Sequence, residues 1–219
     1  MAEQTNYGAD QIRVLHGLEP VRVRPGMYIG STDERGLHHC VYEVIDNCVD
    51  EAMAGYCTEV DIELLNDGGC RVTDNGRGIP VGIKEGEGVS AVEVVLTKLH
   101  AGGKFGNGGY EISGGLHGVG VSCVNALSSK LIVEVAQNNE LWTMSFSRGI
   151  PENHLTKIGN TSKRGTTIIF YPDPDIFDTL EFDYNTLRQR IQELAFLNKG
   201  LKFHYKDSRD LKQQEETFK

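Results

Sequence analysis

Apolar residues recur with a helical period from Gly36 onward, and Gly55 is suited to end the helix. At about 100° per residue, one side of this helix is apolar. That side carries Leu37, Val41, Val44, Ile45, Cys48 and Ala52. The opposite side carries a polar stripe of His39, Glu43, Asp46, Asn47 and Asp50. The pattern predicts an amphipathic helix whose apolar side packs on a core.

Alternating and helical patterns continue along most of the chain. Val60, Ile62 and Leu64 alternate with polar residues, a turn signal follows at 66–69, and the alternation resumes at 70–74, which indicates a β-hairpin. Further helices are predicted over 90–100, 119–128 and 183–198, and further strands over 130–137, 141–148, 165–172 and 201–206.

The two ends of the chain lack a sustained pattern. Residues 1–25 are expected to form an extended N-terminal arm with a short amphipathic piece from Asp10 to Leu18. Residues 207–219 contain few apolar side chains and are expected to fray. We predict one domain over residues 26–206, because a chain of 219 residues can be organised around a single core.

A glycine-rich segment interrupts these patterns between residues 101 and 120. Such a segment is either a functional lid or a disordered linker. Its position between well-patterned elements favours a lid, because long irregular stretches inside a compact domain usually carry function. We place the lid at about 82–120.

Composition narrows the classes of function. The formal net charge is −9, the wrong sign for a chain that binds nucleic acid by neutralising phosphates. Hydrophobic residues make up 39% of the chain, and no apolar run reaches the roughly 18 residues of a membrane span. The five cysteines show no C-x-x-C spacing, and the N-terminus does not resemble a signal peptide. These features fit a cytoplasmic protein that does not enter a membrane.

The polar stripe of the first helix is either an ordinary solvated face or a surface that faces a cation. A solvated face normally includes Lys or Arg, yet residues 43–52 contain neither, while Asp46, Asp50 and Glu51 lie close together. Mg²⁺ prefers oxygen ligands and is often shared with substrate phosphates. The composition of the stripe therefore favours a divalent ion.

Particular atoms of the stripe suit such an ion and a reacting water. Asn47 could supply one oxygen without adding negative charge beside phosphates. Glu43, one turn away, could accept a proton from the water, and His39 could orient Glu43.

Two later segments suit a nucleotide. Residues 74–80 are either an ordinary turn or a site for a flat ring, where Asp74 could accept a hydrogen bond from an exocyclic amine between Ile79 and Pro80. Residues 113–122 end at a helix start, where unpaired amides favour phosphate, although they match neither the Walker pattern nor G-x-G-x-x-G.

Four motifs stand in order along the chain: E-x-x-x-N-x-x-D-E from Glu43, D-x-G-x-G from Asp74, G-x-x-G-x-G from Gly115, and Gly165-Thr166 at a strand start. Together they resemble the ATPase superfamily of gyrase, heat-shock chaperones, sensor histidine kinases and mismatch-repair proteins. Within it, the segments RPGMYIG, DEAMAG, DNGRGIPV, LHAGGKF and SGGLHGVGVSCVNALS are most similar to the N-terminal ATPase domains of the bacterial DNA gyrase B family.

The resemblance implies an α/β (α+β) two-layer sandwich of the Bergerat type, in which a mixed, mostly antiparallel sheet backs the helices of an ATP pocket. It implies Glu43 as general base, His39 as its orienting partner and Asn47 as the Mg²⁺ ligand. The remaining residues implied at the nucleotide are Val44, Asp50, Glu51, Asp74, Arg77, Gly78, Ile79, Pro80, Val95, Lys104, Tyr110, Gly115, Leu116, His117, Gly118, Val119, Gly120, Thr166 and Ile168.

Several of these residues have specific implied roles. Asp74 would bind the adenine amino group, with Thr166 helping through water. Arg77 would cover the ring edge and pair with Glu51. Tyr110 and Lys104 would contact the nucleotide from the lid, and the backbone amides of residues 116–120 would bind the phosphates.

The resemblance also implies partners. The N-terminal arm would embrace a second copy of the same chain when ATP binds, and absent C-terminal domains would join the gyrase A protein. ATP hydrolysis would then drive DNA strand passage and negative supercoiling in the full-length complex, and inhibitors could occupy the ATP pocket. Gln137 stands where family members often have an Arg that aminocoumarin inhibitors contact.

Three other interpretations remain open. The ATPase component of topoisomerase IV shares all the motifs. A sensor kinase and a non-catalytic nucleotide-sensing module belong to other functional classes. A sensor kinase usually lacks a base at the position of Glu43, so this residue argues against that class.

Overall fold

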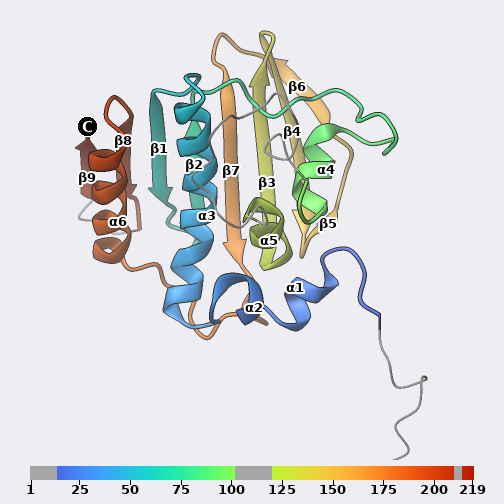
Figure 1. The fold of residues 1–219 in the computed structure, drawn as a ribbon, viewed down its shortest axis with the longest axis horizontal. Helices are drawn as coiled ribbons and strands as arrows, with labels where there is room; N and C mark the ends of the chain where they lie inside the picture. Colours follow the sequence, from blue (N-terminus) through green and yellow to red (C-terminus); the bar gives the residue numbers. More distant parts are fainter. Residues whose placement is uncertain (1–13, 102–119, 210–213) are drawn as a thin grey trace, which may run out of the picture.

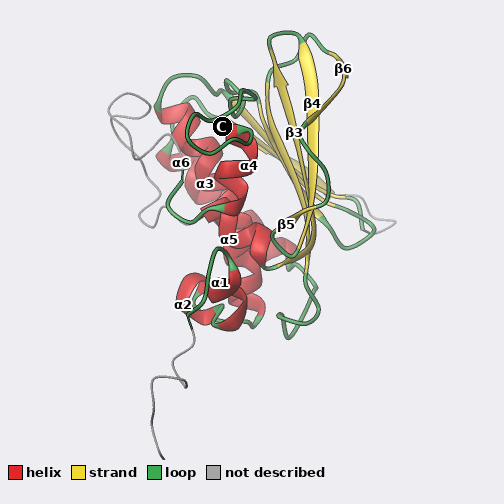
Figure 2. Ribbon diagram, turned by 90° about the vertical axis from the view of Figure 1, so that its right-hand side faces the viewer, coloured by secondary structure: helices red, strands yellow, loops and turns green. Residues whose placement is uncertain are grey.

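The computed structural model describes residues 14–101, 120–209 and 214–219. The described part has two layers, a nine-stranded sheet and a layer of helices (Figure 1). In Figure 2 the helices lie on one side of the sheet, and the opposite face carries none of the described helices. The predicted two-layer α/β sandwich is therefore confirmed.

The sheet is mixed and mostly antiparallel, as expected. Its strands follow the order β5-β4-β3-β7-β2-β1-β8-β9, with β6 paired to β4, and the parallel pair is β1 with β8. The strands are β1 (Glu59–Leu64), β2 (Cys70–Asp74), β3 (Ser128–Gln137), β4 (Glu140–Ser147), β5 (Ile150–Pro151), β6 (Thr156–Asn160), β7 (Gly165–Pro172), β8 (Lys202–Asp207) and β9 (Gln214–Phe218).

The helices cover one face of this sheet. The described helices are α1 (Glu19–Val23), α2 (Gly26–Ile29), α3 (Glu34–Met53), α4 (Ala91–Thr97), α5 (Gly120–Ala126) and α6 (Tyr184–Leu197). α3 is the longest of them, with 20 residues, and packs closely against α5. The predicted helices over 36–55, 90–100, 119–128 and 183–198 are confirmed, with ends that differ by a few residues.

Strand alternation separates the two faces of the sheet. On β1, Val60, Ile62 and Leu64 are buried against the helical layer, and full burial of such side chains contributes about 1.5–3 kcal/mol each. The intervening residues face the open side, where Glu59 contacts Lys202 at 3.2 Å and His204 at 2.6 Å. The open face is thus covered by paired polar groups across neighbouring strands.

Local capping fixes where α3 begins. The Asp33 carboxylate accepts a hydrogen bond from the Arg35 amide, which satisfies one of the unpaired donors of the first turn. Further along, the buried His38 accepts a hydrogen bond through Nε2 from the Asp183 amide at 2.8 Å. Asp183 caps α6, so this bond ties the starts of α3 and α6 together.

The polar stripe predicted on α3 is only partly exposed. Asp50 is 0% exposed and Glu51 is 8% exposed, so neither lies on a solvated face. The helical pattern places Asp50 opposite the apolar side of α3, but it does not predict that Asp50 is buried there. The pattern of a single helix reveals one covered side, whereas α3 contacts both the sheet and α5.

The N-terminal region is more structured than its sequence pattern indicates. Residues 19–29 form two short helices instead of part of an extended arm, and residues 1–13, including Asp10 of the predicted amphipathic piece, lie outside the described residues. α1 has five residues with a proline in its first turn, and α2 has four. Helices this short do not complete a hydrophobic repeat, so periodicity does not detect them.

The C-terminal tail does not simply fray. Gln214–Phe218 forms β9, which pairs antiparallel with β8. Glu216 on this strand accepts hydrogen bonds from Arg188 Nε at 2.6 Å and from the Tyr184 hydroxyl at 3.0 Å. β9 is a polar edge strand that is held by pairing with β8 and by contacts with α6. Because it has few apolar residues, the sequence pattern does not predict it.

Two further strands were not predicted. β5 and β6 pair with β4 at the edge of the sheet, and most of their residues are exposed. A strand without a buried face has no alternation to detect.

β7 begins at a residue that tolerates no side chain. A Cβ on Gly165 would lie 1.9 Å from the Asp74 carbonyl oxygen, and the φ angle of this glycine is +126°. Gly165→Ala should therefore lower the free energy of unfolding by about 3 kcal/mol, through steric overlap and backbone strain. Urea denaturation measures this loss.

Gly159→Ala on β6 is the matched control. A Cβ there meets no atom within 4 Å, so the substitution should change the unfolding free energy little. Equal effects of the two substitutions would contradict the close approach of β7 to Asp74.

Candidate nucleotide site

One part of the candidate site is a carboxylate and imidazole pair on α3. Glu43 Oε1 lies 3.0 Å from His39 Nε2, one helical turn away, and the Glu43 side chain is 16% exposed. The hydrogen bond to Glu43 raises the pKa of His39. The predicted partnership of these two residues is present, with His39 placed to fix the orientation of the carboxylate.

Asn47 lies one turn further along α3, with its amide oriented by the backbone. Its Nδ2 donates a hydrogen bond to the Glu43 carbonyl oxygen at 2.9 Å. Because that carbonyl can only accept, the nitrogen must face it, and Oδ1 is the end of the amide that is turned away. An amide oxygen beside a carboxylate suits a hard cation such as Mg²⁺.

The start of α5 lies directly against this group. A Cβ on Gly120 would approach Glu43 Oε2 to 2.8 Å and Asn47 Nδ2 to 3.6 Å. Because Gly120 has no side chain, the backbone at the start of α5 can lie close to the side chains of Glu43 and Asn47.

A second part of the candidate site is the carboxylate at the end of β2. Asp74 Oδ1 accepts hydrogen bonds from the Gly76 amide at 2.7 Å and the Thr166 amide at 3.4 Å. Burial raises the pKa of Asp74 to about 6. Cys48 Sγ on α3 lies 3.9 Å from Asp74 Oδ2, which places α3 next to this carboxylate.

Thr166 connects β7 to the turn after β2. Its hydroxyl oxygen accepts a hydrogen bond from the Ile79 amide at 3.3 Å, while its own amide donates to Asp74. The side-chain amide of Gln137 donates toward the carbonyl oxygens of Arg77 at 3.3 Å and Gly78 at 3.5 Å. These bonds hold the turn over residues 76–79 against β3 and β7.

The expected contact between Arg77 and Glu51 is present. The Arg77 amide and Nε each donate to Glu51 Oε1 at 2.8 Å, and Arg77 Nη2 donates to Oε2 at 3.0 Å. The guanidinium also stacks over the Tyr56 ring, 3.7 Å from its centroid. This bidentate pair explains how Glu51 is buried without loss of a partner.

The other predicted residues fall into three groups. Val44 and Ile168 are buried in the core, and Val95 is partly buried. Pro80 is exposed, so a role as an apolar wall has no support from its burial. Those outside the described residues are Lys104, Tyr110, Gly115, Leu116, His117, Gly118 and Val119.

Sequence reasoning missed two contacts at this site. Tyr56 follows the end of α3 and lies under Arg77, but nothing in the hydrophobic pattern marks it. Gln137 was considered only in relation to inhibitors, whereas it hydrogen-bonds the backbone of the turn that contains Gly78.

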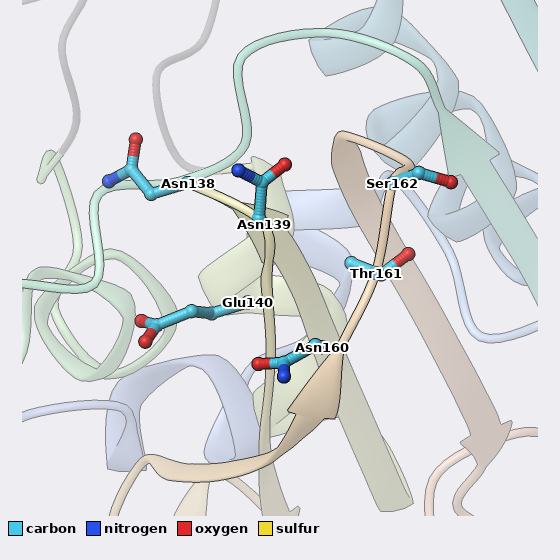
Figure 3. Close-up of a pocket in the computed structure, with 6 residues that line it drawn as sticks. All are labelled: Asn138, Asn139, Glu140, Asn160, Thr161 and Ser162. Carbon is cyan, nitrogen blue, oxygen red and sulfur yellow. The ribbon is translucent and has the colours of Figure 1, made fainter.

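A separate hollow of about 530 Å³ lies at the tips of neighbouring hairpins (Figure 3). Its lining residues are polar and exposed or partly exposed, and Glu140 among them pairs with Lys157 at 2.6 Å. The lining residues are Asn138, Asn139, Glu140, Asn160, Thr161 and Ser162. None of them belongs to the group around Glu43 or to the group around Asp74.

Comparison with known protein families shows which family the chain belongs to. The profile of the "Histidine kinase-, DNA gyrase B-, and HSP90-like ATPase" family matches residues 32–176, which include all the described elements from α3 to β7. The chain belongs to this ATPase family. The family assignment implies that this ATPase uses ATP.

Individual relatives agree with the family. This ATPase is 56% identical to the DNA gyrase B protein of Chlamydia muridarum over 99% of the chain, and 60% identical to that of Micrococcus luteus over 93%. Identity to the DNA gyrase B protein of Staphylococcus aureus is 57% over 94% of the chain. The chain spans 28%, 28% and 32% of the length of these three relatives, respectively.

None of the described helices is both long and apolar enough to cross a membrane.

The raised pKa of Asp74 predicts that ATP binding depends on pH. The folded chain keeps the proton on Asp74 to a higher pH than the unfolded chain does. The contribution of Asp74 to the free energy of unfolding therefore falls as the pH rises from 3.8 to about 6. The ionised carboxylate is the better acceptor for an amine. The affinity for ATP should therefore fall by up to about tenfold per pH unit below 6, as measured by anisotropy of a labelled ATP.

Asp74→Asn is the control for this titration. The amide keeps an acceptor oxygen but does not titrate, so the pH dependence that remains in the variant comes from other groups. Identical pH profiles of the variant and the unchanged chain would exclude Asp74 as the source.

The close contact at Gly120 predicts a separate effect on hydrolysis. Gly120→Ala forces Glu43 or α5 to move, because the added Cβ would lie 2.8 Å from Glu43 Oε2. We expect the ATP hydrolysis rate to fall by about 100-fold, the scale for a shift of about 1 Å in a catalytic group, with little change in adenosine affinity. Gly26→Ala, where the Cβ meets nothing within 4 Å, is the control for a steady-state rate assay. A normal rate for Gly120→Ala would contradict the contact.

Proposed function

We propose that this ATPase binds ATP along α3, with the base near Asp74 and the terminal phosphate near Glu43. The main support is that α3 joins both groups: its Cys48 lies next to Asp74, and its Glu43, on another side of the helix, is five residues earlier, about 7.5 Å along the axis. A nucleotide laid along this helix would meet an amine acceptor at one end and a carboxylate with an oriented imidazole at the other.

At the phosphate end, Glu43 acts as the general base. It accepts the proton of the attacking water, and His39 keeps the carboxylate oriented through the 3.0 Å contact. Asn47 would hold Mg²⁺ through Oδ1, while the remaining ligands come from phosphate and water. The bound ion would neutralise charge on the phosphates.

At the base end, Asp74 accepts a hydrogen bond from the adenine amino group. Thr166 supports this through its hydroxyl, which lies beside the Ile79 amide. Arg77, held by Glu51, covers the edge of the ring. The segment outside the described residues, including Lys104 and Tyr110, is proposed to contact the nucleotide from the lid, and Leu116 to Gly120 to offer amides to the phosphates.

The wider function follows from the relatives. DNA gyrase B proteins of several bacteria share 54–60% identity with this chain. We infer that the chain is the ATPase part of such a protein, in which ATP binding joins two copies and hydrolysis drives DNA strand passage with a gyrase A partner. The net charge of −9 is consistent with DNA contacts being made elsewhere in the complex.

An assay on the full-length protein with its partner tests the wider function. Introduction of negative supercoils supports a gyrase, whereas decatenation alone assigns the protein to topoisomerase IV. Binding of ATP without either activity would indicate a nucleotide-sensing module. The 219-residue chain alone is expected to bind ATP and to hydrolyse it slowly, as its resemblance to the gyrase B family implies.

Glu43→Gln tests the hydrolytic step. The amide keeps the size of the side chain but cannot accept the proton, so hydrolysis should fall by about 100-fold or more, while ATP binding changes less than about threefold. Single-turnover hydrolysis with excess protein detects slow rates in this chain, and calorimetry measures binding.

The exposed Glu152 supplies the control for charge removal. Glu152→Gln should leave both hydrolysis and binding unchanged, since it lies on the loop after β5 and away from α3. Hydrolysis by Glu43→Gln at the unchanged rate would remove Glu43 from the mechanism.

A further inference from the structure

A second buried charged cluster lies where α1, α5 and the end of β7 meet. The Asp173 carboxylate is 0% exposed, and its Oδ2 lies 2.9 Å from Arg22 Nη2 and 2.8 Å from Arg148 Nε. A buried carboxylate is tolerated when such partners compensate for lost hydration. The two arginines come from different parts of the chain, so Asp173 connects α1 with the turn after β4.

Arg22 also binds the end of α5 directly. Its Nη1 donates a hydrogen bond to the Ala126 carbonyl oxygen at 2.7 Å, and Ala126 is the last residue of the helix. A cation is favourable at this position, because the final carbonyls of a helix lack partners and carry partial negative charge. In Figure 2, α1 lies next to α5.

The backbone after α5 is fixed by the same cluster. The Asp173 amide donates to the Leu127 carbonyl oxygen at 3.0 Å, and the Arg148 amide donates to the Ser128 carbonyl oxygen at 3.0 Å. Arg22 is thus the member of the cluster that joins this end of α5 to the N-terminal helix.

The opposite end of α5 lies against Glu43, the proposed general base. Gly120 packs on Glu43 and Asn47, and Ala126 is six residues later, about 9 Å along the axis. A helix of about two turns is stiff, so a shift at Ala126 is passed on to Gly120. Along its length, α5 is anchored by Asn125 Nδ2, which donates to the Leu96 carbonyl oxygen at 2.8 Å.

We propose that Arg22 is a positioning residue for ATP hydrolysis, acting through α5 to set the placement of Gly120 against Glu43. This inference rests on the proposed function of the site. It links the N-terminal segment to the phosphate end of the nucleotide and not to the base end, because Asp74 and Thr166 are held by the sheet. Displacement of α1 would change the rate of hydrolysis more than the affinity for the base.

Substitution of Arg22 separates rate from affinity. Arg22→Gln should lower the single-turnover rate of ATP hydrolysis about tenfold, the scale expected for loss of a charge-assisted hydrogen bond. The dissociation constant for adenosine should stay within about twofold of the unchanged chain. Arg22→Lys keeps the cation and should recover part of the rate. Arg24→Gln, at an exposed arginine two residues later, is the control and should have the unchanged rate.

A double substitution guards against a general loss of folding. Arg22→Gln alone leaves Asp173 with Arg148 as its remaining guanidinium partner, whereas Arg22→Gln with Asp173→Asn also removes the buried charge. The inference requires the double variant to show the same slow hydrolysis. Recovery of the unchanged rate in the double variant would overturn it.

Hydrogen exchange provides a readout that does not depend on hydrolysis. In the nucleotide-free chain, Arg22→Gln should speed amide exchange in α5 about tenfold, without a change in the β1 and β2 hairpin. Unchanged exchange in α5, or an unchanged rate, would overturn the positioning role. An equal loss of hydrolysis rate and adenosine affinity would also overturn the positioning role and would indicate a general structural role for Arg22. If the unchanged chain binds ATP without hydrolysing it, the proposed function fails, and the exchange measurement still decides whether Arg22 positions α5.

Discussion

The packing of α3 between the sheet and its neighbouring helices fixes the position of the side chains that we propose to act in hydrolysis. Leu37, Val41 and Ile45 are completely buried along this helix, so it cannot rotate without exposing them. A shift of one residue would turn the helix by about 100° and remove Glu43 and Asn47 from α5. The core therefore sets the geometry of the Glu43 and His39 pair as well as the stability of the fold.

The two ends of the candidate site are held by different parts of the structure. Asp74 and Thr166 lie on neighbouring strands that approach so closely that Gly165 cannot carry a side chain. Glu43 instead meets α5, a short helix whose position depends on its contacts at both ends. Because the sheet holds Asp74 and α5 adjoins Glu43, the proposed base and phosphate ends of the site could be controlled separately.

Most of the fold could be predicted from the sequence because its central elements have one buried face. The hairpin of β1 and β2 and the helix α3 each show their period clearly, and the ordered motifs indicated the ATPase family. The pairing of Glu43 with His39 could be predicted because both lie on one helix face. Burial of Asp50 could not, since the pattern of one helix does not show which neighbours cover its second side. Tyr56 and Arg22 act through contacts with residues distant in sequence or in loops, which no local period records.

Cys48 gives the base end of the site a chemical property of its own. Burial raises the pKa of this thiol, and its sulfur donates to the Val44 carbonyl oxygen at 3.4 Å while lying 3.9 Å from Asp74. At neutral pH it therefore remains a protonated, weakly polar group beside a carboxylate, and not a second anion. Because the thiolate is the reactive form of cysteine, the buried Cys48 thiol should resist oxidants and electrophiles.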